Sequence, residues 1–192
     1  MSRALKLLAI FAAFVAIVTL SRHSTSPSTT STSTSSTSST STTSTTLKPA
    51  GTTCVASEFN GVFNQGEGAA GTVFASILLT KTTTGACTVD GYPLLTLQDK
   101  KGAILKSRIL DTSPVDFPTA QANDPAQLLT LRDGSTMSFS LGYSDVAVGT
   151  ETCASATTLN VQFTAGGPVI TVNPAYPVEP CNSGTVWVSP FY

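Results

Sequence analysis

Histidine is almost absent from this sequence: His23 is the only one, and it precedes the part of the chain with a globular composition. A folded domain without histidine cannot activate a nucleophile through a Ser-His-Asp or Cys-His arrangement. It also cannot form a His-Cys-Met copper site or a zinc site that uses histidine. The sequence therefore favours a protein that is not an enzyme and that carries no cofactor and no metal.

Basic residues are also few where the chain has a globular composition. Between residues 51 and 192, six bases stand against eleven acids, which gives a net charge of −5. Domains that bind nucleic acid carry a basic patch or stripe for the phosphates. None is present here, so we expect no nucleic-acid partner.

Long apolar runs are missing as well. The longest, Leu7 to Leu20, has fourteen residues and follows Arg3 and Lys6, whereas a membrane span takes roughly 20. A basic segment before such a run is typical of an export signal. No A-x-A cleavage site and no lipid-accepting cysteine follow, so residues 1–20 are a cleaved signal or an uncleaved membrane anchor. Either one predicts an exported chain, secreted or anchored, that touches the membrane only through this segment.

Residues 21–50 are dominated by serine and threonine. From Ser24 to Thr46 every residue is Ser or Thr except Pro27. Such a segment has no apolar side chains whose burial could offset the entropy of ordering it. The composition is typical of a disordered stalk that can carry O-linked glycans. A stalk is most useful when its N-terminus stays attached, which slightly favours the anchor.

Cysteine is scarce, with four residues and no C-x-x-C spacing that would suggest a zinc site. An even number in an exported chain predicts two disulfides, for which three pairings exist. Residues paired across an antiparallel hairpin keep a constant sum of residue numbers. Pairing Cys54 with Cys87 centres a hairpin near residue 70, and pairing Cys153 with Cys181 centres one at 167, both close to glycines. We therefore predict the disulfides Cys54–Cys87 and Cys153–Cys181.

Residues 51–192 have the length of one domain, and their pattern is almost entirely that of strands. Three segments, 72–81, 135–143 and 157–163, alternate apolar and polar residues, as strands covered on one face do. Turn residues separate them at 99–102, 132–135 and 166–168. The side chains expected to face inward are Val73, Ala75, Ile77, Leu79, Met137, Phe139, Leu141, Tyr143, Leu159, Val161 and Phe163.

Eight or nine short strands and no convincing helical periodicity predict an all-β sandwich. The preferred form is two antiparallel sheets in an immunoglobulin-like arrangement with two disulfides, and the alternative is a cupredoxin-like sandwich without metal. Residues 111–125 contain three prolines and are the longest expected loop.

Carboxylates offer one route to catalysis, because glycoside hydrolases use a pair of acids. The acids here show no diagnostic spacing, and Asp90, Asp99 and Asp133 stand in turns where aspartate bonds the local backbone. A carboxylate-based hydrolase of cell-wall sugars therefore stays open as an alternative function. A carrier of a small ligand between the two sheets is another.

Aromatic residues offer a ligand platform. Val186 and Val188 share one face of a strand, which places Trp187 on the other, where it can stack on a sugar or a partner. The simpler interpretation is that Trp187 covers a sheet edge or lies under the 111–125 loop. Tyr176 stands between two prolines, in a segment that reads more simply as a rigid connection.

The stretch "ACTVDGYPLLTLQDKKG", residues 86–102, reads as a structural corner. Asp90 and Gly91 predict a turn, with Gly91 free to take a positive φ. Pro93 holds Tyr92 extended, so that its ring can lie over the end of the sandwich with the hydroxyl bonded to backbone. Cys87 is then one partner of the disulfide with Cys54 and not a nucleophile.

These features together resemble a known family. "CTVDGYPLLTLQDKKG", then "LRDGSTMSFSLGYSD" before the third cysteine, and "TVWVSP" after the fourth are similar to the domain of unknown function 4232 family of exported bacterial proteins. The similarity covers most of residues 54–190, and Cys87 to Pro93 is its most specific part. The resemblance implies a disulfide-stapled β-sandwich outside the cytoplasm. It implies no activity and no site residues.

The sequence thus predicts an exported, non-catalytic module of the cell envelope. We expect it to bind a protein or glycan partner or to serve structurally.

Overall fold

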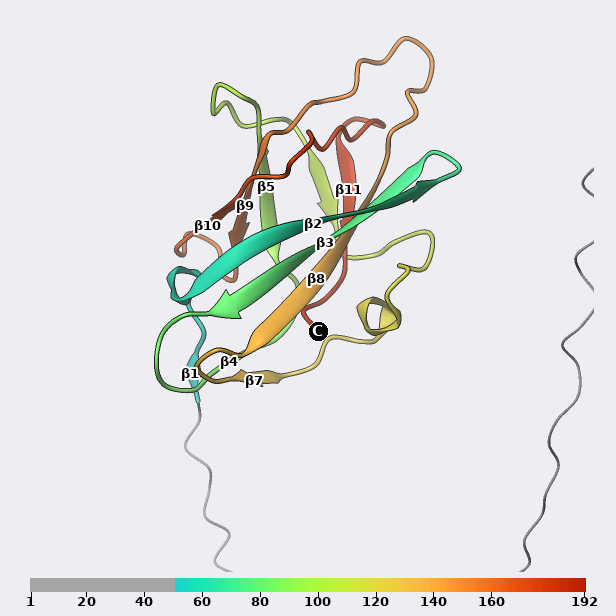
Figure 1. Ribbon diagram of the computed structural model, residues 1–192. Helices are drawn as coiled ribbons and strands as arrows, with labels where there is room; N and C mark the ends of the chain where they lie inside the picture. Colours follow the sequence, from blue (N-terminus) through green and yellow to red (C-terminus); the bar gives the residue numbers. More distant parts are fainter. Residues whose placement is uncertain (1–50) are drawn as a thin grey trace, which may run out of the picture. The chain divides into compact units, whose positions relative to one another are not determined.

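Strands make up most of residues 51–192, the part of the chain that the computed structural model describes (Figure 1). The export segment and the stalk, residues 1–20 and 21–50, lie outside the described residues. Within the described part, no helix has the length and apolar character needed to cross a membrane. The elements are β1 (Thr52–Thr53), η1 (Ala56–Glu58), β2 (Phe59–Ala69), β3 (Thr72–Lys81), β4 (Cys87–Val89), β5 (Leu94–Gln98), β6 (Arg108–Leu110), η2 (Ala120–Asn123), β7 (Leu129–Leu131), β8 (Thr136–Ser144), β9 (Thr158–Gln162), β10 (Ile170–Val172) and β11 (Thr185–Val188), where η marks a 3-10 helix.

Hydrogen bonds join these strands into three sheets. The largest has the order β2-β3-β8-β11-β6, and the two smaller ones have the orders β10-β9-β5 and β1-β4-β7. In Figure 1 the five-stranded sheet lies across the strands β5, β9 and β10, as the two layers of a sandwich do. The predicted all-β, sandwich-like fold with two disulfides is confirmed.

Strand direction differs from the prediction in two places. β1 runs parallel to β4, and β11 runs parallel to β6, so the sheets are not purely antiparallel. Alternation of apolar and polar residues identifies the buried face of a strand but carries no information about the direction of its neighbours. The immunoglobulin-like topology and its cupredoxin-like alternative stay predictions.

The core contains the side chains that the alternation predicts. Ile77 of β3 lies opposite Phe139 of β8, and both are completely buried. Burial of each such side chain contributes about 1.5–3 kcal/mol. Among the predicted inward residues, Val73 and Phe163 are partly buried at the margin of the core. The buried ones are Ala75, Ile77, Leu79, Met137, Phe139, Leu141, Tyr143, Leu159 and Val161.

The disulfide Cys153–Cys181 forms as predicted and for the predicted reason. Ala156 pairs antiparallel with Val178, and this pair has the same sum of residue numbers as the two cysteines. The hairpin between β9 and β10 turns through a hydrogen bond from the Gly167 N–H to the Thr164 carbonyl.

The disulfide Cys54–Cys87 also forms, but its surroundings differ from the prediction. The hairpin of β2 and β3 turns at residues 70–71, where the index sum centres it. Cys54 lies before that hairpin, next to β1, which pairs with β4 in parallel. The predicted pairing is therefore right, although the two cysteines are not cross-strand partners in an antiparallel ladder.

Lys81, the last residue of β3, is a buried cation with 2% of its surface exposed. Its Nζ lies 3.5 Å from Oε1 of Glu58 and donates to the hydroxyl and carbonyl of Thr83. It also lies 5.8 Å from the ring centroid of Phe59. These contacts offset the cost of removing an ammonium group from water. Lys81 thus connects the start of β2 to the loop that follows β3.

The carboxylate of Glu58 is held in its charged form. The backbone N–H of Val55 donates to it, Lys81 lies beside it, and the Thr83 hydroxyl donates to it. These contacts, with the Val55 hydrogen bond as the largest, lower the pKa of Glu58 below its ordinary value of 4.5.

Replacing Glu58 should show how much the buried Lys81 depends on this carboxylate. Glu58→Gln leaves Lys81 charged and buried without its carboxylate, so we expect a loss of about 1–2 kcal/mol in the free energy of unfolding at pH 7. Because the folded-state pKa is lowered, the carboxylate contributes fully above its unfolded value of 4.5 and loses its contribution as pH falls through the folded value. The stability difference between wild type and variant should therefore shrink in acid.

Urea unfolding of both proteins from pH 7 down to pH 3 measures this difference. Asp111→Asn serves as the control, because Asp111 is exposed and accepts no side-chain hydrogen bond within residues 51–192. If the difference in the free energy of unfolding between wild type and Glu58→Gln stays constant down to pH 3, the charged form of Glu58 is not what stabilises the fold.

Candidate functional site

The segment Asp90–Pro93 joins β4 of one sheet to β5 of another. Gly91 has φ of +78°, in the left-handed region that other residues resist. Its carbonyl accepts a hydrogen bond of 3.0 Å from the N–H of Phe191, which is itself buried. The segment therefore changes the chain from one sheet to the next and holds the residues that follow β11.

Two side chains of this segment differ from the expectation. Within the described residues, the Tyr92 hydroxyl and the Asp90 carboxylate make no hydrogen bond. The Tyr92 ring packs against the core, and Asp90 is exposed. The turn is formed by the glycine backbone and needs neither polar group. Asp99 does behave as expected, since hydrogen bonds from the N–H groups of Ala103 (2.9 Å) and Lys101 (2.8 Å) lower its pKa.

Trp187 lies on the outer face of the five-stranded sheet. Val186 and Val188 are buried, so the tryptophan between them points the other way. In the sheet register, Gly142 of β8 lies between Trp187 and Phe74 of β3. A Cβ on Gly142 would lie 3.1 Å from Phe74 Cδ1 and 3.3 Å from Trp187 Cε3. Both rings therefore lean over the glycine, and Trp187 is partly buried instead of standing free.

Tyr176 has a different environment. It is 68% exposed in the connection that follows β10, and among residues 51–192 no aromatic pair joins its ring to Trp187. The structure thus does not combine these two candidates into one platform.

Residues 111–125, which we call the strap, pack on the outer face of the five-stranded sheet. Phe117 of the strap is 6% exposed and meets Phe74 edge to face, with 5.9 Å between the ring centroids. The side chain of Asn123 accepts a hydrogen bond from the Phe117 N–H (2.7 Å) and donates one to the Phe117 carbonyl (2.9 Å). Ala122 is also buried. The aromatic contact and the amide clamp hold the strap in one shape.

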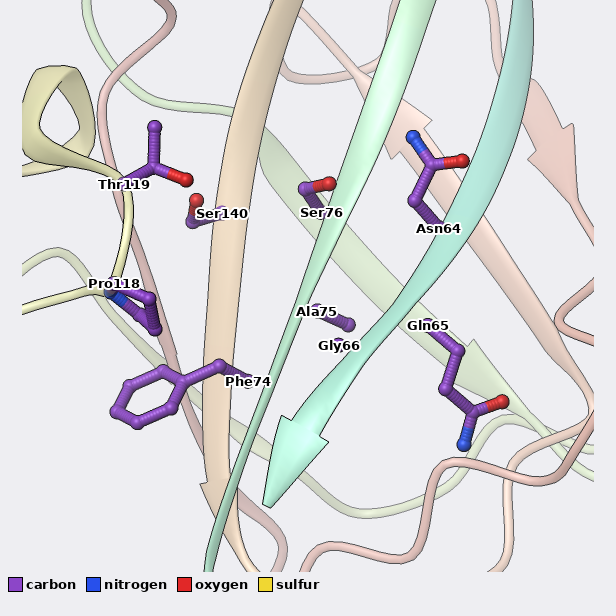
Figure 2. A pocket seen from close by; sticks show the side chains of 9 residues that line it. All are labelled: Asn64, Gln65, Gly66, Phe74, Ala75, Ser76, Pro118, Thr119 and Ser140. Carbon is purple, nitrogen blue, oxygen red and sulfur yellow. The ribbon is translucent and has the colours of Figure 1, made fainter. Parts of the chain in front are cut away.

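A cleft of about 240 Å³ lies between the strap and the outer face of β2, β3 and β8. Figure 2 shows Pro118 and Thr119 on the strap side, Phe74 extending toward Pro118, and Ser76 and Asn64 on the neighbouring strands. The lining residues are Asn64, Gln65, Gly66, Phe74, Ala75, Ser76, Pro118, Thr119 and Ser140.

Three polar residues of the cleft form one row across the strands. Asn64 of β2 lies opposite Ser76 of β3, which lies opposite Ser140 of β8. Neighbouring strands are about 4.8 Å apart, so the row is about 10 Å long. The Ser140 hydroxyl lies 2.8 Å from the hydroxyl of Tyr192. Because a hydroxyl pair can reverse its donor and acceptor, Ser140 can either donate to a ligand or accept from it.

The cleft has no charge of its own. None of its lining residues is an acid, a base or a tyrosine. Within the described strands only Glu67, Lys81 and Arg108 are charged. The strap, in contrast, carries three acids and no base. The site is therefore an uncharged surface beside an acidic loop.

The arrangement can form hydrogen bonds and apolar contacts, and it offers no acid–base group. A glycosidase would need two carboxyl groups in the cleft, and the lining has none. Among residues 51–192, no three His, Cys, Asp or Glu side chains are grouped to hold a metal. Burial raises the pKa of Tyr143, but this residue, like Glu58 and Asp99, is not part of the lining.

No local pattern in the sequence identifies this cleft. Alternation within 135–143 and the prolines of residues 111–125 predict a strand and a loop, but neither pattern shows that the loop lies over the row of polar residues. Two phenylalanines are the sequence features that indicate a covered outer face. Phe74 occupies an outward position on β3, and Phe117 is a large apolar residue in a polar loop. Each needs an apolar neighbour, and they cover one another.

The corner provides a prediction about backbone conformation. Gly91→Ala should destabilise the fold by about 1–2 kcal/mol, because a side chain disfavours the left-handed region. No atom lies within 4 Å of the added Cβ, so steric overlap does not contribute. Gly91→Asn should cost less, since asparagine tolerates this conformation. Asp90→Asn and Tyr92→Phe should stay within about 0.5 kcal/mol of wild type. Chemical unfolding measures all four; equal losses for Gly91→Ala and Gly91→Asn would refute this explanation.

The glycine between the two rings provides another prediction. Gly142→Ala should push Phe74 and Trp187 apart, because both rings lie closer to the added Cβ than an ordinary contact of 3.4–4 Å. Trp187 is the only tryptophan of the chain, so its emission reports this change directly. We expect a shift to longer wavelength as the ring becomes more exposed. Ser138→Ala, four residues away on the same face of β8, is the control and should leave the emission unchanged. An unaltered spectrum in Gly142→Ala would contradict the predicted ring positions.

Comparison with known proteins places the chain in a family. The searches of curated proteins and of solved structures found no significant match. Residues 54–192 match the family described as Domain of unknown function (DUF4232), and this range covers strands β2 to β11, both disulfides, the strap and the cleft. The chain therefore belongs to the DUF4232 family.

Proposed function

We propose that this protein is an exported, non-catalytic module of the cell envelope that binds a glycan in the cleft beneath the strap. The two disulfides fit an oxidising compartment outside the cytoplasm. The N-terminal apolar run would export the chain or anchor it, and the Ser/Thr-rich segment would hold the folded domain away from its attachment point.

The observation that carries this proposal is the composition of the cleft. Asn64, Ser76, Thr119 and Ser140 supply amide and hydroxyl groups, and Phe74 supplies an aromatic ring. Sugars present hydroxyl groups together with apolar C–H faces, which suit polar partners placed beside an aromatic ring. The strap is fixed by its own contacts, so the cleft exists before a ligand arrives and less ordering is lost on binding.

The two alternatives have less support. Acid–base hydrolysis needs carboxylates, and the cleft lining contains none. A carrier needs a pocket of several hundred Å³ between the sheets, where Ile77, Leu97 and Val161 are packed with at most 1% of their surface exposed.

The test blocks the cleft in the full-length protein. Ser76→Tyr places a bulky side chain in the row of polar residues, and Thr96→Tyr places the same side chain on the outer face of β5, away from the cleft. Tyrosine suits strand positions, so both variants should fold. We expect the wild type and Thr96→Tyr to bind isolated cell-wall polysaccharide saturably in a sedimentation assay, and Ser76→Tyr to lose at least tenfold in affinity.

Three outcomes would overturn the proposal. They are equal binding by all three proteins, no saturable binding by any of them, and binding that disappears after the wall material is treated with protease. Release of reducing sugar by the wild type would instead support the hydrolase.

A further inference from the structure

We propose that the glycan bound in the cleft is an uncharged chain of pyranose sugars, recognised without any ionic contact. This inference rests on the proposed function and specifies its ligand. It follows from the distribution of charge, from the spacing of the polar row and from the size of the cleft.

Charge excludes the anionic glycans. A ligand that carries carboxylate or phosphate groups needs cationic partners or oriented N–H groups. The cleft lining contains no lysine and no arginine. The strap as a whole carries three acids, Asp111, Asp116 and Asp124, and no base, so it adds no cationic partner for such a ligand. A cationic ligand would find no ion-pair partner among the lining residues either, because none of them carries a carboxylate.

The polar row matches a sugar chain in length. Asn64, Ser76 and Ser140 extend over two strand spacings, about 10 Å, which is the length of a disaccharide. Amide and hydroxyl groups both donate and accept, as sugar hydroxyls do. The row therefore offers one hydrogen-bonding group to each end of a disaccharide and one to the linkage between its rings.

The apolar part of the cleft suits one sugar ring. The cleft as a whole has a volume of about 240 Å³, which is below the roughly 300–1,000 Å³ of sites for drug-sized ligands. A single pyranose ring can lie against Phe74 with its C–H face, since the face of an aromatic ring attracts polarised C–H groups. Pro118 closes the strap side (Figure 2). The remainder of the chain would follow the polar row across the strands.

Tyr192 acts as a positioning residue in this arrangement. Its hydroxyl lies 2.8 Å from the hydroxyl of Ser140, which is 3% exposed and has little water available to it. The pair holds the Ser140 oxygen in position at the cleft lining, and either hydroxyl can be the donor. Tyr192→Phe should therefore weaken binding about as much as the loss of one hydrogen bond, roughly fivefold, while the ring keeps its packing.

The experiment uses the full-length protein and six-unit oligosaccharides. Neutral probes are hexamers of glucose, mannose and galactose, and charged probes are hexagalacturonate and a short poly(glycerol phosphate). Titration calorimetry measures binding, and Trp187 emission provides a second signal because this ring lies beside Phe74. We expect at least one neutral hexamer to bind at least tenfold more tightly than either charged probe. Its affinity should change less than twofold between 50 and 500 mM salt, since exposed ionic contacts would be screened over this range.

Matched variants locate the ligand. Asn64→Ala and Ser76→Ala should each weaken binding of the neutral hexamer about fivefold, the cost of one hydrogen bond. Asn160→Ala makes the same change on the outer face of β9, and it should have no effect. Circular dichroism and thermal unfolding confirm that each variant is folded.

The outcomes separate this inference from the proposed function. If wall polysaccharide binds in a manner blocked by Ser76→Tyr, but only the charged probes compete, the inference is wrong and the proposed function stands. If wall polysaccharide itself does not bind, both fail. If a neutral hexamer binds and Asn160→Ala weakens it while Asn64→Ala does not, the ligand lies on the other sheet and the inference is wrong.

Discussion

Side chains on β3 alternate between the two faces of the five-stranded sheet, and the register with β8 extends this alternation to the neighbouring strand. Ile77 and Leu79 enter the core, while Phe74 and Ser76 are left on the outer face. A shift of one residue would exchange the two sets, so the core and the cleft depend on the same register. Burial of the inner face, at about 1.5–3 kcal/mol for each large apolar side chain, fixes it. The binding surface is thus a consequence of how the core is packed.

The outer face would be an ordinary solvated surface without the strap. Phe117 covers Phe74, and Asn123 binds both backbone groups of Phe117, so the strap has a defined shape without belonging to a sheet. Its position converts part of a polar sheet face into a cleft with one aromatic wall. Charged residues lie almost entirely outside the strands, and none of them lines the cleft, although the domain is acidic. The fold therefore combines a rigid, disulfide-stapled scaffold with an uncharged binding surface.

The sequence predicts those parts of the fold that depend on residues close together in the chain, and it does not predict contacts between distant segments. Period-two alternation identified the buried faces of β3, β8 and β9, because that signal is local. The sums of residue numbers gave both disulfides, although Cys54 reached its partner through a parallel strand pair that no local pattern reveals. The corner at Gly91 was foreseen from its turn residues, whereas the expected hydrogen bond of the Tyr92 hydroxyl is absent because the backbone completes the turn.

The cleft could not be predicted, because it requires knowledge of where a loop folds back. The polar residues that line it, such as Asn64 and Thr119, belong to no motif and come from segments far apart in the sequence. The outward Phe74 and Trp187 and the apolar Phe117 were the hints that something covers this face. Membership of the DUF4232 family does not indicate a ligand or a binding site either, because the family is described only as a domain of unknown function.

The central claim is that ligand binding occurs on the outer face of β2, β3 and β8 beneath the strap. Nuclear magnetic resonance of the ¹⁵N-labelled protein, titrated with the wall-derived oligosaccharide that binds most tightly, tests it directly. The account predicts that amide signals of Asn64, Ser76, Thr119 and Ser140 shift together with the side-chain amide of Asn64. Shifts confined to the outer face of β5, β9 and β10, or to the loops at the ends of the sandwich, would contradict it.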